Sequence, residues 1–223
     1  MKTTEAPVVH ARYAAFRHSA FTRYWLARAF ASFATQIVSV AVGWQIYDLT
    51  RDPFDLGLVG IIQFAPSLLL FLVTGAVADR FGRRMIMGLS VTLEAVCASV
   101  LLMLTLRGLS SALPVFAVLA VFGIARAFLG PASASLIANL VPAKDFANAV
   151  AWNSTAWHLA TITGPVAGGL LYGVSAEAAF GTAVVLMLAA AGFCFSIPKP
   201  SQRTETEQPS IEALLAGFRY IWR

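Results

Sequence analysis

The chain has 223 residues, of which 58% are hydrophobic and 12% charged, and its formal net charge is +5. Soluble domains carry about 25% charged residues, so this composition excludes an ordinary soluble fold and indicates a protein that lies mostly in a lipid bilayer. The Lys and Arg residues form short clusters between apolar blocks. That pattern is typical of membrane-helix flanks and argues against a nucleic-acid-binding surface.

Residues 1–20 form a basic, polar N-terminal segment that lacks the apolar core and cleavage site of a signal peptide. Six apolar blocks follow, each long enough as a helix to cross about 30 Å of hydrocarbon. They lie at 24–47, 54–78, 84–106, 113–138, 150–173 and 178–197. The blocks lack the period-two alternation of membrane strands. The sequence therefore predicts an all-α membrane protein in which residues 21–197 form a six-helix transmembrane bundle.

Both ends of this bundle are predicted to face the cytosol. With that orientation, twelve of the sixteen Lys and Arg residues flank the inner side, and Arg51 and Arg107 flank the outer side. Because an excess of Lys and Arg marks cytoplasmic loops, we expect an integral protein of a bacterial-type cytoplasmic (inner) membrane.

Residues 198–223 differ in character from the blocks before them. The stretch KPSQRTETEQPS is polar and linker-like, and IEALLAGFRYIWR repeats apolar residues at helical spacing. We expect a cytosolic linker that leads into an amphipathic helix on the inner membrane surface. Another spanning segment would normally follow this pattern. The bundle is therefore expected to need a missing C-terminal half or a second copy of itself.

The connection between the second and third blocks carries the segment GAVADRFGRR, residues 75–84. Its glycines permit a tight turn, and Asp79 can pair with an arginine or cap a helix N-terminus. The segment resembles the loop signature of the major facilitator superfamily, G-x-L-A-D-R-x-G-R-R/K, and departs from it at Val77. The resemblance implies that this chain is one half of a two-half fold, built as a 3+3 inverted repeat. It also implies a conformational latch made of Gly75, Asp79, Arg80, Gly82, Arg83 and Arg84.

The fourth block contains VFGIARAFLGPA, residues 121–132. This segment resembles the fourth-helix motif of the same superfamily through Arg126 and Gly130. An arginine at this depth costs at least about 2.5 kcal/mol in hydrocarbon, so Arg126 should face the bundle interior or a wet cavity. A purely structural arginine that binds backbone carbonyls is the alternative.

The fifth block contains helix-breaking residues in the stretch ATITGPVAGG, residues 160–169. Small residues recur every four positions from Ala156 to Gly168, which predicts a smooth face where a neighbouring helix approaches closely. Pro165 should bend the helix, and the hydroxyls of Thr161 and Thr163 are near enough to satisfy the freed backbone groups.

This stretch resembles the fifth-helix antiporter motif of the superfamily, G-x-x-x-G-P-x-x-G-G, with Ala160 in place of the first glycine. The matching residues are Gly164, Pro165, Gly168 and Gly169. The resemblance implies outward transport, since in the family this motif marks exporters.

Candidate groups for a proton relay lie at membrane depth in three blocks. Glu94 lies near the midplane of the third block. Arg126 offers an opposing charge, and His158 can titrate near neutral pH. Gln36 belongs to a polar stripe of the first block that should line an interior path. A structural Glu–Arg pair and a hydrogen-bonded core histidine are the alternatives, and Arg28 is expected to extend to the inner interface.

Several kinds of enzyme site are missing from the sequence. It contains no GxxxxGK[ST] phosphate loop, G-x-S-x-G elbow or HExxH zinc motif. We therefore expect a protein that is not an enzyme and needs no cofactor or metal. The two cysteines, Cys97 and Cys194, lie inside apolar blocks and are expected to be small buried hydrophobes.

Within the superfamily, FRHSAFTRYWLARAFASFATQI and AVAWNSTAWHLATITGPVAGGLLY are most similar to the enterobactin-exporter-type and drug:proton antiporter branch. The resemblance implies proton-coupled export, by antiport, of a small organic molecule such as a siderophore or drug. A non-transporting membrane scaffold or an inactive truncated remnant is the alternative.

Overall fold

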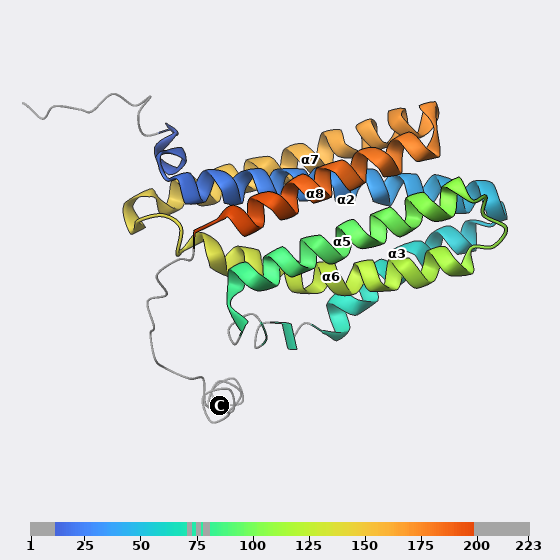
Figure 1. Cartoon of the computed structure of the whole chain (residues 1–223), viewed down its shortest axis with the longest axis horizontal. Helices are drawn as coiled ribbons and strands as arrows, with labels where there is room; N and C mark the ends of the chain where they lie inside the picture. The colour runs from blue at the N-terminus through green and yellow to red at the C-terminus, as the bar shows by residue number, and fades with distance from the viewer. Residues whose placement is uncertain (1–11, 71–72, 75–76, 78–80, 199–223) are drawn as a thin grey trace, which may run out of the picture.

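The computed structural model describes residues 12–70, 73–74, 77 and 81–198 (Figure 1). In these residues every predicted apolar block contains an α-helix, so the all-helical prediction is confirmed there. The latch residues Gly75, Asp79 and Arg80 lie outside the described residues, as does the predicted amphipathic helix. The helices are α2 (Ser19–Thr50), α3 (Pro53–Leu69), α5 (Arg83–Leu106), α6 (Leu113–Ile137), α7 (Phe146–Val174) and α8 (Ala176–Ser196), with 3-10 helices η1 (Ala14–Arg17) and η2 (Ala143–Asp145).

Two helices begin at side chains that satisfy a free backbone donor. Asp52 accepts a hydrogen bond from the Phe54 amide at 2.9 Å, and Pro53 occupies the first turn of α3. Ser175 accepts from the Ala178 amide at 3.0 Å and begins α8. Both residue types are favoured at helix N-caps because the first amides of a helix have no partner within it.

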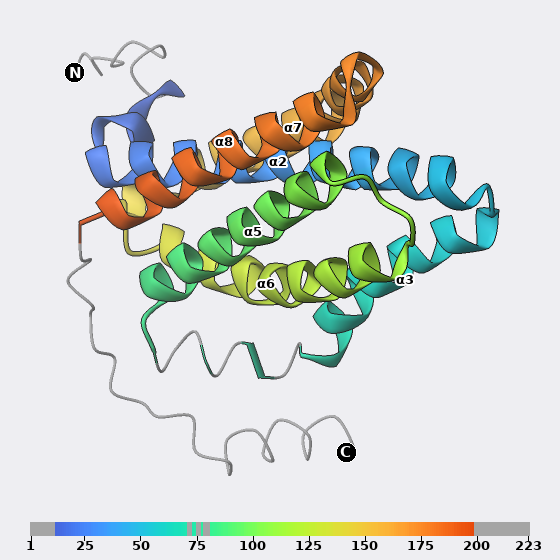
Figure 2. The same cartoon turned by 45° about the vertical axis from the view of Figure 1, so that its right-hand side comes forward.

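The helices pack as a layered bundle in which α8 lies between α2 and α5 (Figures 1 and 2). Helix α7 packs along α2, α6 packs along α5, and α3 packs on α6. Apolar side chains fill the bundle at both ends. One cluster includes Phe21, Met87 and Leu136, and the other includes Leu101 and Leu119.

Four helices of the described residues, α2, α5, α6 and α8, are long and apolar enough to cross a membrane. Helix α3 is apolar but has 17 residues. Helix α7 has 29 residues and is more polar, because residues such as Asn148, Asn153 and His158 lie in it. That α3 and α7 also cross the bilayer, and that the helices form a 3+3 repeat, stay predictions.

The end of the predicted N-terminal segment packs against the start of α7. The Arg12 carbonyl accepts hydrogen bonds from Asn148 Nδ2 at 2.9 Å and from Trp152 Nε1 at 2.8 Å. His18 Nε2 lies 2.9 Å from Asp145 Oδ2. These contacts hold residues 12–18 at the same end of the bundle as the last turn of α8, where Arg23 donates to the Ser196 carbonyl.

Helix α3 packs closely against α6 at Gly123. A Cβ added there would lie 2.8 Å from the Gln63 carbonyl oxygen and 3.1 Å from Pro66 Cγ, whereas a Cβ added at Gly130 would meet nothing within 4 Å. Gly123→Ala is therefore expected to lower the free energy of unfolding by about 1–3 kcal/mol through overpacking. Gly130→Ala, the matched control, should leave stability unchanged or raise it by up to about 1 kcal/mol. Thermal unfolding of the two variants in one detergent checks this, and equal midpoints would contradict it.

Candidate functional site

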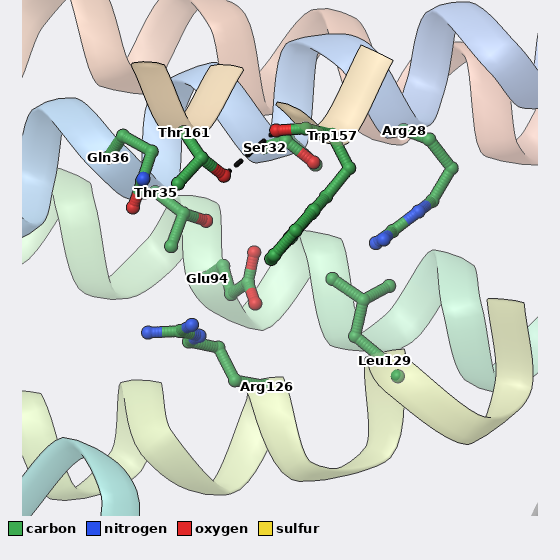
Figure 3. Close-up of a pocket in the computed structure, with 11 residues that line it drawn as sticks. Arg28, Ser32, Thr35, Gln36, Glu94, Arg126, Leu129, Trp157 and Thr161 are labelled. Atoms are coloured by element: carbon green, nitrogen blue, oxygen red, sulfur yellow. Dashed lines mark hydrogen bonds between the residues drawn. The ribbon is translucent and has the colours of Figure 1, made fainter. Parts of the chain in front are cut away.

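A cavity of about 380 Å³ lies among four helices near the middle of the bundle (Figure 3). Helix α2 supplies one wall, α7 lies beside it, and α5 and α6 supply the opposite wall. The residues that line the cavity are Arg28, Ala31, Ser32, Thr35, Gln36, Glu94, Arg126, Leu129, Gly130, Trp157 and Thr161. The structure thus brings together Glu94, Arg126 and Gln36, three of the four predicted relay residues.

Glu94 is the most deeply buried charged residue of this cavity. Its side chain is 0% exposed, and neither carboxylate oxygen has a hydrogen-bond partner among the described residues. A buried polar group without a partner costs roughly 1–3 kcal/mol, and an ionised one costs more. No hydrogen bond within the described residues offsets the burial of this carboxyl group.

Two arginines face Glu94 across the cavity (Figure 3). Arg126 of α6 is exposed to the cavity, and its Nη1 donates a long hydrogen bond of 3.5 Å to Gln63 Oε1. Arg28 of α2 is half-buried, and its Nε is buried without a partner in the described part of the chain. The charged residues that line the cavity are therefore two arginines and one glutamate, so positive charge is in excess even when Glu94 is ionised.

The α2 wall is polar, as predicted from its stripe of hydroxyl and amide side chains. Ser32, Thr35 and Gln36 line the cavity from three neighbouring positions of this helix. Arg28 lines the cavity one turn earlier on the same helix, and its extension to the inner interface stays a prediction. Because long polar side chains are stable in a bilayer only beside water or other polar groups, this wall can hold water or a polar ligand.

Trp157 of α7 gives the cavity its large aromatic surface. Its side chain is 50% exposed, and Figure 3 shows the indole close to Glu94. His158, the fourth predicted relay residue, does not line the cavity. It is exposed and packs edge-on against Trp157, with 5.0 Å between ring centroids.

The smooth face predicted for α7 is confirmed. Its buried residues are Ala149, Ala156, Ala160, Gly164 and Gly168, and α2 is the helix that packs along this face. A Cβ added at Gly164 would lie 2.7 Å from Gln36 Cβ, and one added at Gly168 would lie 3.1 Å from Ile37 Cα. The two glycines therefore set how closely α7 approaches the cavity wall.

Pro165 is accommodated inside a helix that runs without interruption from Phe146 to Val174. The expectation for the nearby hydroxyls is wrong. Thr161 Oγ1 donates to the Trp157 carbonyl and Thr163 Oγ1 to the Leu159 carbonyl, each at 2.8 Å. Both hydroxyls bind the carbonyl one turn before them, which is the one within reach of a threonine in a helix.

The sequence matches the family model described as Major Facilitator Superfamily over residues 24–223. The chain belongs to this superfamily. One similar protein is the multidrug efflux pump Tap of Mycolicibacterium fortuitum, with 27% identity over 83% of this chain and 48% of Tap. The enterobactin exporter EntS of Shigella boydii serotype 18 has 27% identity over 92% of this chain and 49% of EntS. The chain thus spans about half the length of these relatives.

Membership of the Major Facilitator Superfamily and the apolar helices indicate an integral membrane protein, and the family and these relatives point to a transporter rather than an enzyme. The family relationship also confirms the resemblance that the loop, fourth-helix and fifth-helix motifs indicated.

The described part of the superfamily's loop signature binds the ends of two helices. Gly82 has a φ of +83°, a conformation that favours glycine, and α5 begins immediately after it. Arg83 Nη1 donates to the Ser135 carbonyl at 3.1 Å near the end of α6, and Arg84 donates to the Phe195 carbonyl at the end of α8. Cations stabilise helix C-termini, where carbonyls lack intrahelical partners. The latch role of these arginines stays a prediction.

Two residues of this region were not identified from the sequence. Gln63 contacts Arg126, and Gly123 permits the close approach of α3. The sequence feature that could have identified Gln63 is that it is a single amide side chain in an apolar block, three residues before Pro66. A neutral amide costs less in a bilayer than a charge, so this signal is weaker than that of Glu94.

Proposed function

We propose that this chain is the N-terminal half of a proton-coupled exporter of small organic molecules. The observation that carries the proposal is the carboxyl group of Glu94, which is fully buried, lacks a hydrogen-bond partner in the described residues and lines the same cavity as Arg126. A group in this setting can bind and release a proton as its surroundings change. Arg126 supplies a charge that favours release.

The substrate is proposed to bind beside this carboxyl group. A multidrug efflux pump and an enterobactin exporter are among the relatives, so we propose a small organic molecule such as a siderophore or drug. Trp157 can stack on a flat ring, and Arg28 and Arg126 can donate to acceptor oxygens of the same molecule.

One half supplies one wall of the proposed substrate path. The second wall would come from a C-terminal half or a second copy of the chain, and the two would alternate between inward-open and outward-open arrangements. Exposed apolar side chains on α3 and α7 are suited to contact with lipid or with this second half, among them Ile61, Phe64, Ile162 and Val166. We place the protein in the cytoplasmic (inner) membrane with both ends of the bundle cytosolic.

Antiport follows if the proton and the substrate compete for Glu94. A substrate that donates a hydrogen bond to the ionised carboxylate would leave when a proton arrives from outside. Pro165 and the glycines beside it lie inside α7 and match the antiporter motif that the sequence resembles. His158, outside the cavity, would act only through Trp157.

Glu94→Gln is expected to lower substrate uptake driven by a pH gradient at least tenfold, because glutamine cannot release a proton. The measurement is uptake of fluorescent drugs and of a catecholate siderophore into everted membrane vesicles that contain the protein expressed from its natural reading frame. Glu177→Gln is the matched control, since this acid is exposed at the start of α8.

The same assay separates the alternatives. Unchanged coupling in Glu94→Gln would remove Glu94 from the relay. Absence of uptake by the unaltered protein, over a range of drugs and siderophores, would favour a non-transporting scaffold or an inactive remnant.

A further inference from the structure

Three helices meet at the side-chain oxygen of Gln63. Ser39 of α2 donates its hydroxyl to Gln63 Oε1 at 3.4 Å, and Arg126 of α6 donates Nη1 to the same oxygen at 3.5 Å. Both hydrogen bonds are long. Gln63 itself belongs to α3, so its amide links the cavity arginine to a helix that supplies none of the residues lining the cavity.

Arg126 also has a second possible partner. The charged groups that act on the Glu94 carboxyl are Arg126 of α6 and Arg28 of α2, and the thiols nearby are Cys97 of α5 and Cys194 of α8. Within the described residues neither oxygen of Glu94 accepts a hydrogen bond. This arrangement suits a protonated, neutral carboxyl group, because an ionised one without a hydrogen bond would be strongly disfavoured.

We propose that Arg126 exchanges between two partners, Gln63 on α3 when Glu94 is protonated and the Glu94 carboxylate on α5 when the proton has left. Gln63 is then a positioning residue that transmits the protonation state of Glu94 to α3. The inference rests on the proton-coupled function proposed above. In the exchange the Glu94 proton passes to water in the cavity, Arg126 stays protonated throughout, and no other bond is made or broken.

Helix α3 is placed to respond to this exchange. Gly123 and Arg126 are three residues apart on α6 and therefore lie on one face of it. The Gln63 backbone packs against Gly123 so closely that an added Cβ would lie 2.8 Å from the Gln63 carbonyl oxygen. When Arg126 leaves Gln63, α3 loses a polar contact beside the place where its backbone packs against Gly123 of α6.

The test uses the whole chain in lipid nanodiscs and follows the fluorescence of Trp157, which lies close to Glu94 (Figure 3). The Trp157 signal is obtained by subtracting the spectrum of Trp157→Phe. A pH titration should give a transition that Glu94→Gln abolishes. Gln63→Leu, which frees Arg126 for Glu94, should move its midpoint to lower pH by about one pH unit, a tenfold change in the equilibrium.

Gln63→Glu should move the midpoint in the opposite direction, because a carboxylate on α3 holds Arg126 away from Glu94. The double variant Gln63→Glu/Glu94→Gln identifies any titration of the new acid. Gln45→Leu is the matched control, since Gln45 also belongs to α2 but lies outside the cavity and donates to Thr105 Oγ1, and it should leave the midpoint within a few tenths of a pH unit of the unaltered protein.

The possible results distinguish this inference from the function on which it rests. If Glu94→Gln keeps the transition, Glu94 is not the titrating group, and both proposals fail. The other case is that Glu94→Gln abolishes the transition while the two Gln63 variants either leave its midpoint unchanged or both shift the midpoint in the same direction. In that case only the proposed partner exchange is wrong.

Discussion

Gly164→Ala is expected to destabilise the bundle by about 1–3 kcal/mol, the range measured for overpacked cores. The added Cβ would lie 2.7 Å from Gln36 Cβ and 3.9 Å from Phe33 Cδ1. Because Gln36 Cβ is fixed to the α2 backbone, it cannot rotate away as the end of a long side chain can. Relief requires α7 to move away from α2, which opens contacts along the whole small-residue face.

Gly169→Ala is the matched control for this prediction. Both glycines belong to the segment that resembles the antiporter motif, but a Cβ added at Gly169 would meet nothing within 4 Å. Alanine there should leave stability unchanged or raise it by up to about 1 kcal/mol, since alanine is the better helix former. Unfolding of both variants by heat in the same lipid–detergent mixture measures the difference. Equal losses of stability in the two variants would contradict close packing of α7 on α2 at Gly164.

Gly164→Ala should also lower transport, and Gly169→Ala should leave transport unchanged. Gln36 lines the cavity, so displacement of α7 at Gly164 also changes the shape of the proposed substrate site. The packing argument therefore predicts that one glycine of the motif is needed and another is replaceable, a distinction that the motif alone does not make.

Much of this fold could be predicted because the bilayer imposes simple costs. The apolar blocks gave the helices, and the period of small residues gave the face of α7 that packs on α2. The same period could have placed His158 correctly. It is two residues from both Ala156 and Ala160, about 200° around the helix, so it lies opposite the smooth face and outside the cavity.

The rest depends on tertiary contacts that have no strong local signal. The charges of Glu94 and Arg126 marked them in an apolar sequence, and the structure places both at one cavity. Nothing in the one-dimensional pattern paired Gln63 with Arg126, because the partner comes from another helix 63 residues away. Likewise, nothing in the sequence distinguished Gly123 from other glycines, because its role depends on the contact with α3.

Glu94→Met is expected to stabilise the bundle while it abolishes proton coupling. The Glu94 side chain is 0% exposed, and both its oxygens lack a hydrogen-bond partner in the described residues. Methionine is unbranched and of similar volume, so it can fill the site and remove the cost of burying an unpaired carboxyl group. Replacement of buried charged groups by apolar ones of similar size is often stabilising, and relief of one unsatisfied group is worth about 1–3 kcal/mol.

Glu94→Ala separates the polar effect from the packing effect. Alanine also removes the carboxyl group but leaves unfilled space, so it should be less stable than Glu94→Met by about 1–3 kcal/mol. The measurement is the unfolding midpoint of each purified variant in nanodiscs, together with vesicle uptake driven by a pH gradient. A Glu94→Met protein less stable than the unaltered one would mean that the carboxyl group forms a stabilising contact, and would count against its role as a proton carrier. Higher stability with lost coupling would instead mean that the carboxyl group is retained at a cost to the fold, as expected for a group whose value lies in its function.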